Sequence, residues 1–203
     1  MKKYILLFIL VFNAIASDYK KDIILYSKEL DTKYNIDYKI ILSYIKTESN
    51  FNQYAMLLKT KDVNFVINVL KDFKIKTFKT FGDFISILPE NKKSAEKIYN
   101  LIFPNIKNLK IVDYDLGLMQ LNRKTIQNYK ISTYKALFDF KQNMLIGADI
   151  LRGCFVTFNH NSTIENVVEC YNKGTNINIL NKSNKKYYEK IIKNFNEISK
   201  EYL

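Results

Sequence analysis

The sequence has few of the residues on which common catalytic devices depend. Among its 203 residues there is one histidine, His160, and there are two cysteines, Cys154 and Cys170. A Ser-His-Asp or Cys-His device would have to use His160, and nothing in the polar stretch FNHNS places it near a nucleophile. Two thiolates lack the third and fourth ligands that zinc prefers, so we expect no metal site, and the sequence implies no cofactor. Carboxylate chemistry remains.

Long apolar runs are also scarce, and the amino end holds the only extended one. Lys2 and Lys3 precede an apolar run over residues 4–12, which is followed by the small-residue pattern Ala14-Ile15-Ala16. This order is typical of a secretory signal peptide cleaved after Ala16. The run is shorter than the roughly 20 residues that a transmembrane helix needs, although retention as an anchor remains an alternative. We therefore expect residues 1–16 to be a signal peptide and the protein to be exported to the periplasm.

The remaining 17–203 contain no internal repeat and no low-complexity linker, so we expect a single domain. The chain is strongly basic, and removal of Lys2 and Lys3 lowers the formal net charge only from +12 to +10. Attraction to a polyanion is one interpretation of this charge. We favour lysines spread over solvated surfaces, because no compact basic cluster interleaved with aromatic residues occurs. Nucleic acid is therefore not an expected partner.

Hydrophobic periodicity predicts helices along most of the chain. Residues 18–35 carry a helical pattern, and Asp37 can cap a second helix that ends near Glu48 and Ser49. Further amphipathic helices are predicted over 65–73 and 95–102, the latter stopped by Pro104. Between them, KIKTFKTFGDFISIL alternates in character on both sides of Gly82, which predicts a β-hairpin. The fold class is thus mainly α with a small hairpin.

Three more helices are predicted from residue 139 onward. Ser162 and Glu165 are expected to form a capping box for the second of them, and Gly174 to end it. Cys154 and Cys170 lie on the first and second of these helices, which can pack side by side. In an oxidising compartment such a pair is readily a disulfide, and two buried free thiols are the alternative.

Glu48 interrupts the apolar stripe of its predicted helix. Ile41, Tyr44 and Ile45 recur at the spacing of one helical face, and Glu48 is the next position on that face. A carboxyl placed against apolar side chains has a raised pKa, because burial disfavours the charged form. Rotation of the side chain into solvent at the helix end is the alternative.

Three short motifs occur in a fixed order: TESNF at 47–51, DLGLMQLN at 115–122 and CYNKG at 170–174. In this order they resemble the lysozyme-like lytic transglycosylases with an SLT domain, similar to glycoside hydrolase family 23. The resemblance covers most of the mature chain. It implies a lysozyme-like fold and cleavage of peptidoglycan glycan strands.

Finer detail resembles the members of this family that accompany conjugation and type IV secretion machines. The stretches that carry this likeness are FISIL, SAEKIYNLI, NLKIVDYDLGLMQLN, LFDFKQNMLIGADILRGCF and VVECY. In that subgroup the two cysteines recur in the matching places, which supports a bond between Cys154 and Cys170. The likeness implies local opening of the wall and components of such a machine as partners.

The resemblance assigns roles residue by residue. It implies that Glu48 is the catalytic acid and base, with Ser49 beside it in the substrate site. It also implies contacts with the glycan from five further side chains: Met119, Gln120, Asn122, Tyr171 and Asn172. Tyr187 resembles a late tyrosine that supports the catalytic glutamate, and Tyr188 is the neighbouring alternative in register. At Cys170 the broader family usually has alanine.

The implied reaction needs one carboxyl group. In the resembled family the glutamate protonates the leaving oxygen, then removes a proton from the C6 hydroxyl of the same muramyl sugar, which closes a 1,6-anhydro ring. A hydrolase usually needs a second carboxylate, for which Asp113 and Asp115 are candidates. We favour a turn role for Asp115, since aspartate is common there. A hydrolysing lysozyme and a non-catalytic wall-binding assembly protein are the alternative functions.

Overall fold

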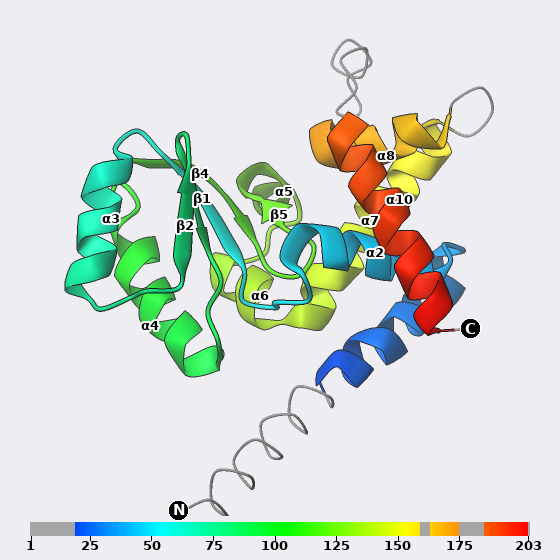
Figure 1. Cartoon of the computed structure of the whole chain (residues 1–203), viewed down its shortest axis with the longest axis horizontal. Coiled ribbons are helices and arrows are strands. Elements are labelled where there is room, and N and C mark those ends of the chain that lie inside the picture. Colours follow the sequence, from blue (N-terminus) through cyan, green and yellow to red (C-terminus); the bar gives the residue numbers. More distant parts are fainter. Residues whose placement is uncertain (1–18, 159–162, 175–184, 203) are drawn as a thin grey trace, which may run out of the picture. The chain divides into compact units, whose positions relative to one another are not determined.

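The structure is a computed structural model and describes residues 19–158, 163–174 and 185–202. The described chain forms two compact units. The first comprises Met1–Tyr44 and Cys154–Leu203, and the second comprises Ile45–Gly153. The chain passes between the units within helix α2, Tyr38–Ser49, and within helix α7, Phe140–Thr157 (Figure 1). Signal-peptide residues 1–16, His160 and Ser162 lie outside the described residues.

The described part of the first unit is helical. It contains a helix over 19–34, the start of α2, the end of α7, α8 over Ile164–Lys173 and α10 over Lys185–Glu201. The predicted start of α2 is confirmed, since the Asp37 carboxylate accepts a hydrogen bond from the Lys39 N–H at 2.8 Å. Gly174 caps the C-terminus of α8 with a φ of +84°, as predicted. The predicted capping box involves Ser162, which lies outside the described residues; Thr163 is the N-cap of α8 and makes no side-chain cap bond.

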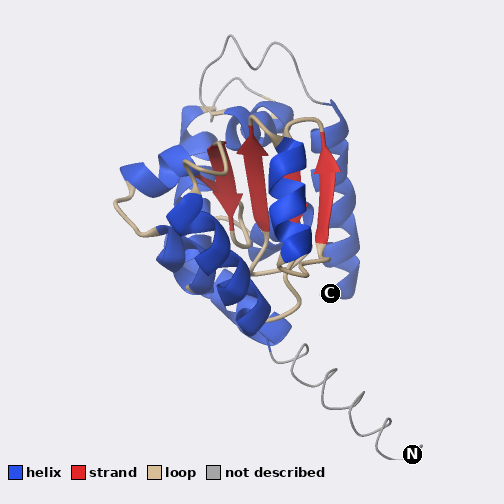
Figure 2. Cartoon of the chain, turned by 90° about the vertical axis from the view of Figure 1, so that its left-hand side faces the viewer, coloured by secondary structure: helices blue, strands red, loops and turns tan. Residues whose placement is uncertain are grey.

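The second unit is built around an antiparallel sheet of five strands in the order β2-β3-β1-β4-β5. Their bounds are β1 Met56–Thr60, β2 Phe78–Phe81, β3 Phe84–Ile87, β4 Ile111–Leu116 and β5 Leu121–Asn122. The β2–β3 pair is the predicted hairpin, in which Phe81 pairs with Phe84 across the Gly82 turn. The other three strands were not predicted from the sequence. Figure 2 shows the strands side by side with helices against the sheet.

Helices cover one face of this sheet and enclose the core of the second unit. They are α3 over Val63–Asp72, α4 over Lys92–Ile102, α5 over Arg123–Asn128 and α6 over Thr133–Phe138. Asp62 caps α3, and Asn91 forms a capping box with Ser94 at the start of α4. Pro104 lies in the 3-10 turn Phe103–Asn105 that follows α4, as its missing N–H predicts. The core residues come from the strands and from all four of these helices.

The mainly helical fold class predicted from the sequence is confirmed, with more strand than a single hairpin. Across residues 19–158, 163–174 and 185–202, no helix is long and apolar enough to cross a membrane.

Candidate functional site

Glu48 lies in the last turn of α2 and is partly buried, as its place on the apolar face predicts. The helix ends directly after it, because Asn50 and Phe51 adopt left-handed φ values of 50° and 63°. Ser49 is 5% exposed, and its hydroxyl donates a hydrogen bond to the Ile45 carbonyl oxygen at 3.0 Å. Glu48 is therefore held at a helix end, while the predicted substrate contact of Ser49 stays a prediction.

A second carboxyl group, that of Asp115, interacts electrostatically with Glu48. Asp115 lies on β4, where it pairs with Leu57 of β1 and with Asn122 of β5. The pKa of Asp115 is raised from its usual 3.8 to about 7, first by burial and then by the negative charges of Asp113 and Glu48, in that order of effect. Asp113 lies two residues earlier on the same strand and is exposed. Glu48 and Asp115, both singled out from the sequence, thus lie close enough for their charges to interact.

Two coupled carboxyl groups in a partly buried site retain a proton near neutral pH, because ionisation of both is disfavoured. Such a site has a proton to donate and a carboxylate to receive one, which are the two requirements for acid–base cleavage of a glycosidic bond. In this structure the carboxyl with the raised pKa is Asp115. The raised pKa that the sequence predicts for Glu48 stays a prediction.

The turn after β4 approaches its neighbours closely at Gly117. This residue has a φ of +80°, and its N–H donates to the Ala55 carbonyl at 2.9 Å. A Cβ atom here would meet the side-chain amide of Asn143 and would lie 2.9 Å from the Ala136 carbonyl oxygen. Only glycine meets both the conformational and the steric requirement. The backbone at Gly117 therefore approaches other protein groups closely.

Asn143 of α7 is buried and holds this turn through its amide. Its oxygen accepts a hydrogen bond from the Met119 N–H at 2.9 Å, and its nitrogen donates to the Leu116 and Ala136 carbonyls at 2.8 Å each. These bonds pair backbone groups that would otherwise be buried without partners. Sequence reasoning missed Asn143, and the one signal for it is an amide among the apolar residues of the first helix predicted after residue 139.

Met119 is fully buried and packs against α7 at Gly147. A Cβ atom on Gly147 would approach the Met119 Cβ to 2.8 Å, so the glycine makes room for the methionine side chain. Met119 presents no exposed surface, and the groove contact predicted for it stays a prediction.

Gln120 and Asn122 follow in the sequence, and both stabilise the local backbone. Gln120 has a φ of +46°, and its side-chain nitrogen donates to the carbonyls of Gly117 at 2.8 Å and Ala55 at 3.2 Å. The Asn122 side chain caps α5 by accepting a hydrogen bond from the Thr125 N–H at 2.8 Å. Gln120 is partly exposed and Asn122 is exposed. Contact of these two side chains with a glycan stays a prediction.

Tyr171, Asn172 and Tyr187 belong to the first unit. The partly buried Tyr171 ring contacts Tyr44 with 4.8 Å between the ring centroids, while Asn172 is exposed. Tyr187 and its alternative Tyr188 lie in the first turn of α10 and are partly buried. The roles of these side chains toward Glu48 and the substrate stay predictions.

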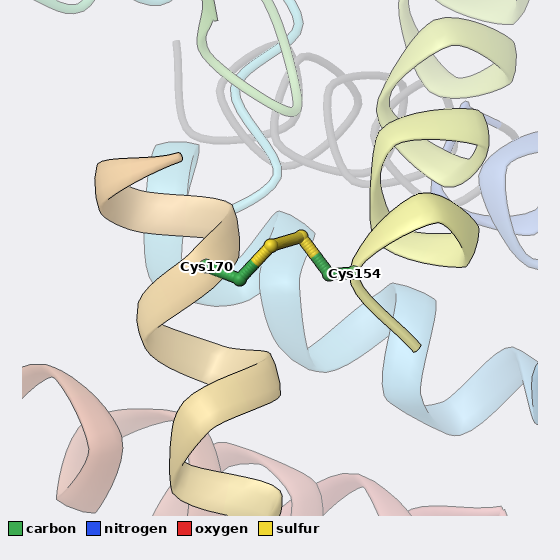
Figure 3. The surroundings of a disulfide bond; sticks show 2 residues. All are labelled: Cys154 and Cys170. Atoms are coloured by element: carbon green, nitrogen blue, oxygen red, sulfur yellow. A yellow bond between two sulfur atoms is a disulfide. The ribbon is translucent and has the colours of Figure 1, made fainter. Parts of the chain in front are cut away.

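The segment that carries Tyr171 and Asn172 is anchored on both sides within α8. Cys154 and Cys170 form the predicted disulfide, with 5.8 Å between their Cα atoms, and join the end of α7 to α8 (Figure 3). Glu169 is buried and forms an ion pair with Lys173 at 2.5 Å, one helical turn further on. Sequence reasoning missed this ion pair, for which the i,i+4 spacing in ECYNK was the available signal.

Metal binding has no candidate among the described residues, since they contain no group of three or more His, Cys, Asp or Glu side chains placed to hold an ion. The candidate active site is composed of Glu48, Asp115 and the turn at 117–120, which the preceding contacts describe.

Comparison with known proteins gives one finding about the whole chain. A family model described as Transglycosylase SLT domain matches residues 25–196. The match spans Glu48, the turn at 117–120 and helix α8, and it covers well over half of the chain. No curated protein and no solved structure matches the chain significantly.

Proposed function

This chain belongs to the transglycosylase SLT domain family and is a peptidoglycan lytic transglycosylase, and from this premise we propose that Glu48 carries its reaction. The bond cleaved is the β-1,4 linkage between MurNAc and GlcNAc. The observation that supports Glu48 is its position at the end of α2, partly buried and coupled electrostatically to the Asp115 carboxyl.

In the first step the carboxylic acid of Glu48 donates its proton to the glycosidic oxygen. The bond between this oxygen and the anomeric carbon breaks as an oxocarbenium-like state develops, and the GlcNAc side leaves as an alcohol. In the second step the Glu48 carboxylate removes the proton of the muramyl C6 hydroxyl. The C6 oxygen then bonds to the anomeric carbon and closes the 1,6-anhydro ring, so that Glu48 regains its proton and no water is consumed.

A hydrolase needs a second carboxylate that stays ionised, either as nucleophile or as base for water. The pKa of Asp115 is raised to about 7, mainly by burial, which disfavours the ionised form that this role requires. We therefore favour the reaction that uses the Glu48 carboxyl alone. A hydrolysing lysozyme that uses Asp115 is the second candidate, because the side chain is close enough to Glu48 to interact with it.

Mass spectrometry of purified peptidoglycan digested by the mature protein tests this function, with Glu48→Gln in parallel. We expect anhydro-muropeptides from the wild-type protein and a rate reduced by at least about 10²-fold in the variant, as is usual when a general acid is removed. The variant should unfold at the same denaturant concentration as the wild type. Equal product from both proteins would refute the role of Glu48.

The products and one further variant separate the two candidate reactions. Hydrolysis would give reducing ends that contain added water, and Asp115→Asn would then be nearly as damaging as Glu48→Gln. For the transglycosylase we expect anhydro ends and a substantial residual rate in Asp115→Asn.

We further propose that the protein is exported and opens the wall locally for a secretion or conjugation machine. Residues 1–16 have the pattern of a signal peptide, and the bond between Cys154 and Cys170 suits an oxidising compartment. Cell fractionation with sequencing of the mature amino terminus tests export and cleavage after Ala16. Copurification of the Glu48→Gln protein with components of such a machine tests the proposed association with a secretion or conjugation machine.

A further inference from the structure

The five-stranded sheet has two chemically different faces. One face carries residues of the core, such as Leu58, Ile85 and Tyr114, which pair across β1, β3 and β4. On the opposite face, cross-strand pairing aligns residues of all five strands in two rows. The first row is Asn122, Asp115, Leu57, Ser86 and Lys79; the second row is Asp113, Lys59, Phe84 and Phe81. We call these nine residues the open face.

The open face is exposed or partly exposed at every one of its positions. Its two ends differ in charge. Asp113 and Asp115 lie at the β4 end, whereas Lys59 and Lys79 lie further across the sheet toward β2. None of its apolar members, Leu57, Phe81 and Phe84, belongs to the core of the unit. The open face is therefore a surface that runs from acidic to basic.

The basic end also holds an aromatic platform. The Phe81 and Phe84 rings are stacked, with 5.5 Å between their centroids and 15° between their planes. The Lys59 ammonium lies 5.5 Å from the centroid of Phe84, within the range of a cation–π contact, which holds the charge beside the platform. Phe81 is 54% exposed. A partly exposed aromatic pair beside two lysines suits a ligand that has both apolar parts and negative charge.

This surface is continuous with the candidate active site, because Asp115 is a member of its first row. Lys79 lies three strands away from Asp115 along that row, and neighbouring strands are about 4.8 Å apart, so the row spans roughly 14 Å. An extended peptide covers about 3.4 Å for each residue, so four residues reach from the acidic end to Lys79. In peptidoglycan, short acidic peptides branch from the muramyl sugars at which cleavage occurs.

We propose that the open face binds the peptide stem of the glycan strand, with Lys59 and Lys79 pairing with stem carboxylates and Phe81 and Phe84 contacting its apolar side chains. This inference rests on the proposed function and assigns the peptide-stem preference of the same site. The acidic end faces the sugar, and the basic end faces the charged part of the stem. Charge complementarity therefore sets the direction in which a stem lies across the sheet.

The test uses the double variant Lys59→Gln/Lys79→Gln and two soluble ligands, glycan strands that carry peptide stems and strands from which an amidase has removed them. Binding is measured with Glu48→Gln proteins, so that no ligand is consumed, and cleavage is measured with Glu48 intact. The matched control is Lys93→Gln/Lys107→Gln, which removes the same charge from exposed lysines that are not on the open face.

We expect binding of stem-bearing strands to weaken about three- to ten-fold in Lys59→Gln/Lys79→Gln, since each exposed ion pair contributes modestly. The loss on stem-free strands should be several-fold smaller, and the control should bind both ligands as the parent does. In cleavage assays the loss should appear in KM for stem-bearing strands, with kcat nearly unchanged.

Three results would overturn the inference. They are equal loss on both ligands, loss in the control pair as large as in the double variant, and unchanged binding of stem-bearing strands. Capture of an acidic protein by the open face, with no difference between the two glycan ligands, would assign the surface to a protein partner instead. Failure of the wild-type protein to cleave peptidoglycan would refute the proposed function, while the binding comparison would still decide the role of the open face.

Discussion

The two compact units differ in how they are held together. The second unit, Ile45–Gly153, contains no cysteine and is organised by one hydrophobic core that joins the sheet to helices α3 to α7. The described part of the first unit is helical and carries the disulfide between Cys154 and Cys170 together with the buried ion pair of Glu169 and Lys173. The first unit also buries apolar side chains, among them Ile23, Leu42 and Val168, so it differs from the second in adding a covalent link between helices.

This difference matches the chemistry assigned to each unit. The second unit holds the carboxyl groups of Glu48 and Asp115, and the raised pKa of Asp115 has a cost in folding free energy at neutral pH that a large core offsets. The first unit presents Tyr171 and Asn172 on a helix of ten residues, α8, which the disulfide ties to α7. Changes that act on only one unit therefore test the comparison.

Replacement of Asp115 by Asn should alter the pH dependence of stability most. The pKa of Asp115 is raised from 3.8 to about 7 in the folded protein, so the folded state binds its proton more tightly than the unfolded state does. The tighter binding of this proton stabilises the folded state fully below about pH 4. The stabilisation is lost as pH rises through 7, and the loss in the free energy of unfolding is at most about 4 kcal/mol. Asp115→Asn should remove this loss, so that the variant exceeds the wild type in stability above pH 7.

Urea unfolding at several pH values between 4 and 8 measures the effect, and Asp83→Asn, at an exposed position in the hairpin turn, is the control. Parallel pH profiles for the wild type and Asp115→Asn would show that Asp115 does not titrate in this range.

Removal of the disulfide should destabilise the first unit. The double variant Cys154→Ala/Cys170→Ala opens a loop of 16 residues, and cross-links over loops of this length contribute about 3 kcal/mol. Hydrogen exchange should accelerate in α8 and in the end of α7, while amides of the sheet keep their protection. Loss of protection in the sheet of the same size would mean that the two units unfold together.

Replacement of Gly117 by Ala should destabilise the second unit by about 2 to 3 kcal/mol, since a φ of +80° is unfavourable for alanine and the Cβ would meet Asn143. Gly153→Ala in α7 is the matched control. No atom lies within 4 Å of its Cβ position, so we expect a gain of roughly 0.5 to 1 kcal/mol. Thermal unfolding of both variants gives the comparison, and equal midpoints would remove the steric argument at Gly117.

Much of the helical architecture could be predicted from the sequence because it depends on local patterns. The helices around 65–73 and 95–102, the cap at Asp37 and the stop at Gly174 follow from periodicity and from residues with a local conformational effect. The β2–β3 hairpin was predicted for the same reason, as its turn and both strands are contiguous. The Cys154–Cys170 pairing also agrees with the prediction, since only two cysteines exist.

Strands β1, β4 and β5 were missed because their pairing is not local. Met56 pairs with Leu116 across sixty residues of sequence, and the alternation within MLLKT is too short to distinguish a strand from a helix end. Asn143 escaped notice for a related reason: its three hydrogen bonds reach the turn after β4 and the end of α6. Such partners become visible only when the chain is folded.

The mainly helical class and the order of the three motifs can be read from residue types and short-range spacing, whereas the choice of Glu48 also rests on the resemblance to a known family. Folding was needed to show that Asp115 lies close enough to Glu48 for their charges to interact, that Met119 is buried, and that acidic residues of β4 share one face of the sheet with basic residues of β1 and β2. Electrostatic coupling and cross-strand pairing depend on distances between residues far apart in the chain, and these distances arise from the packing of the sheet against its helices.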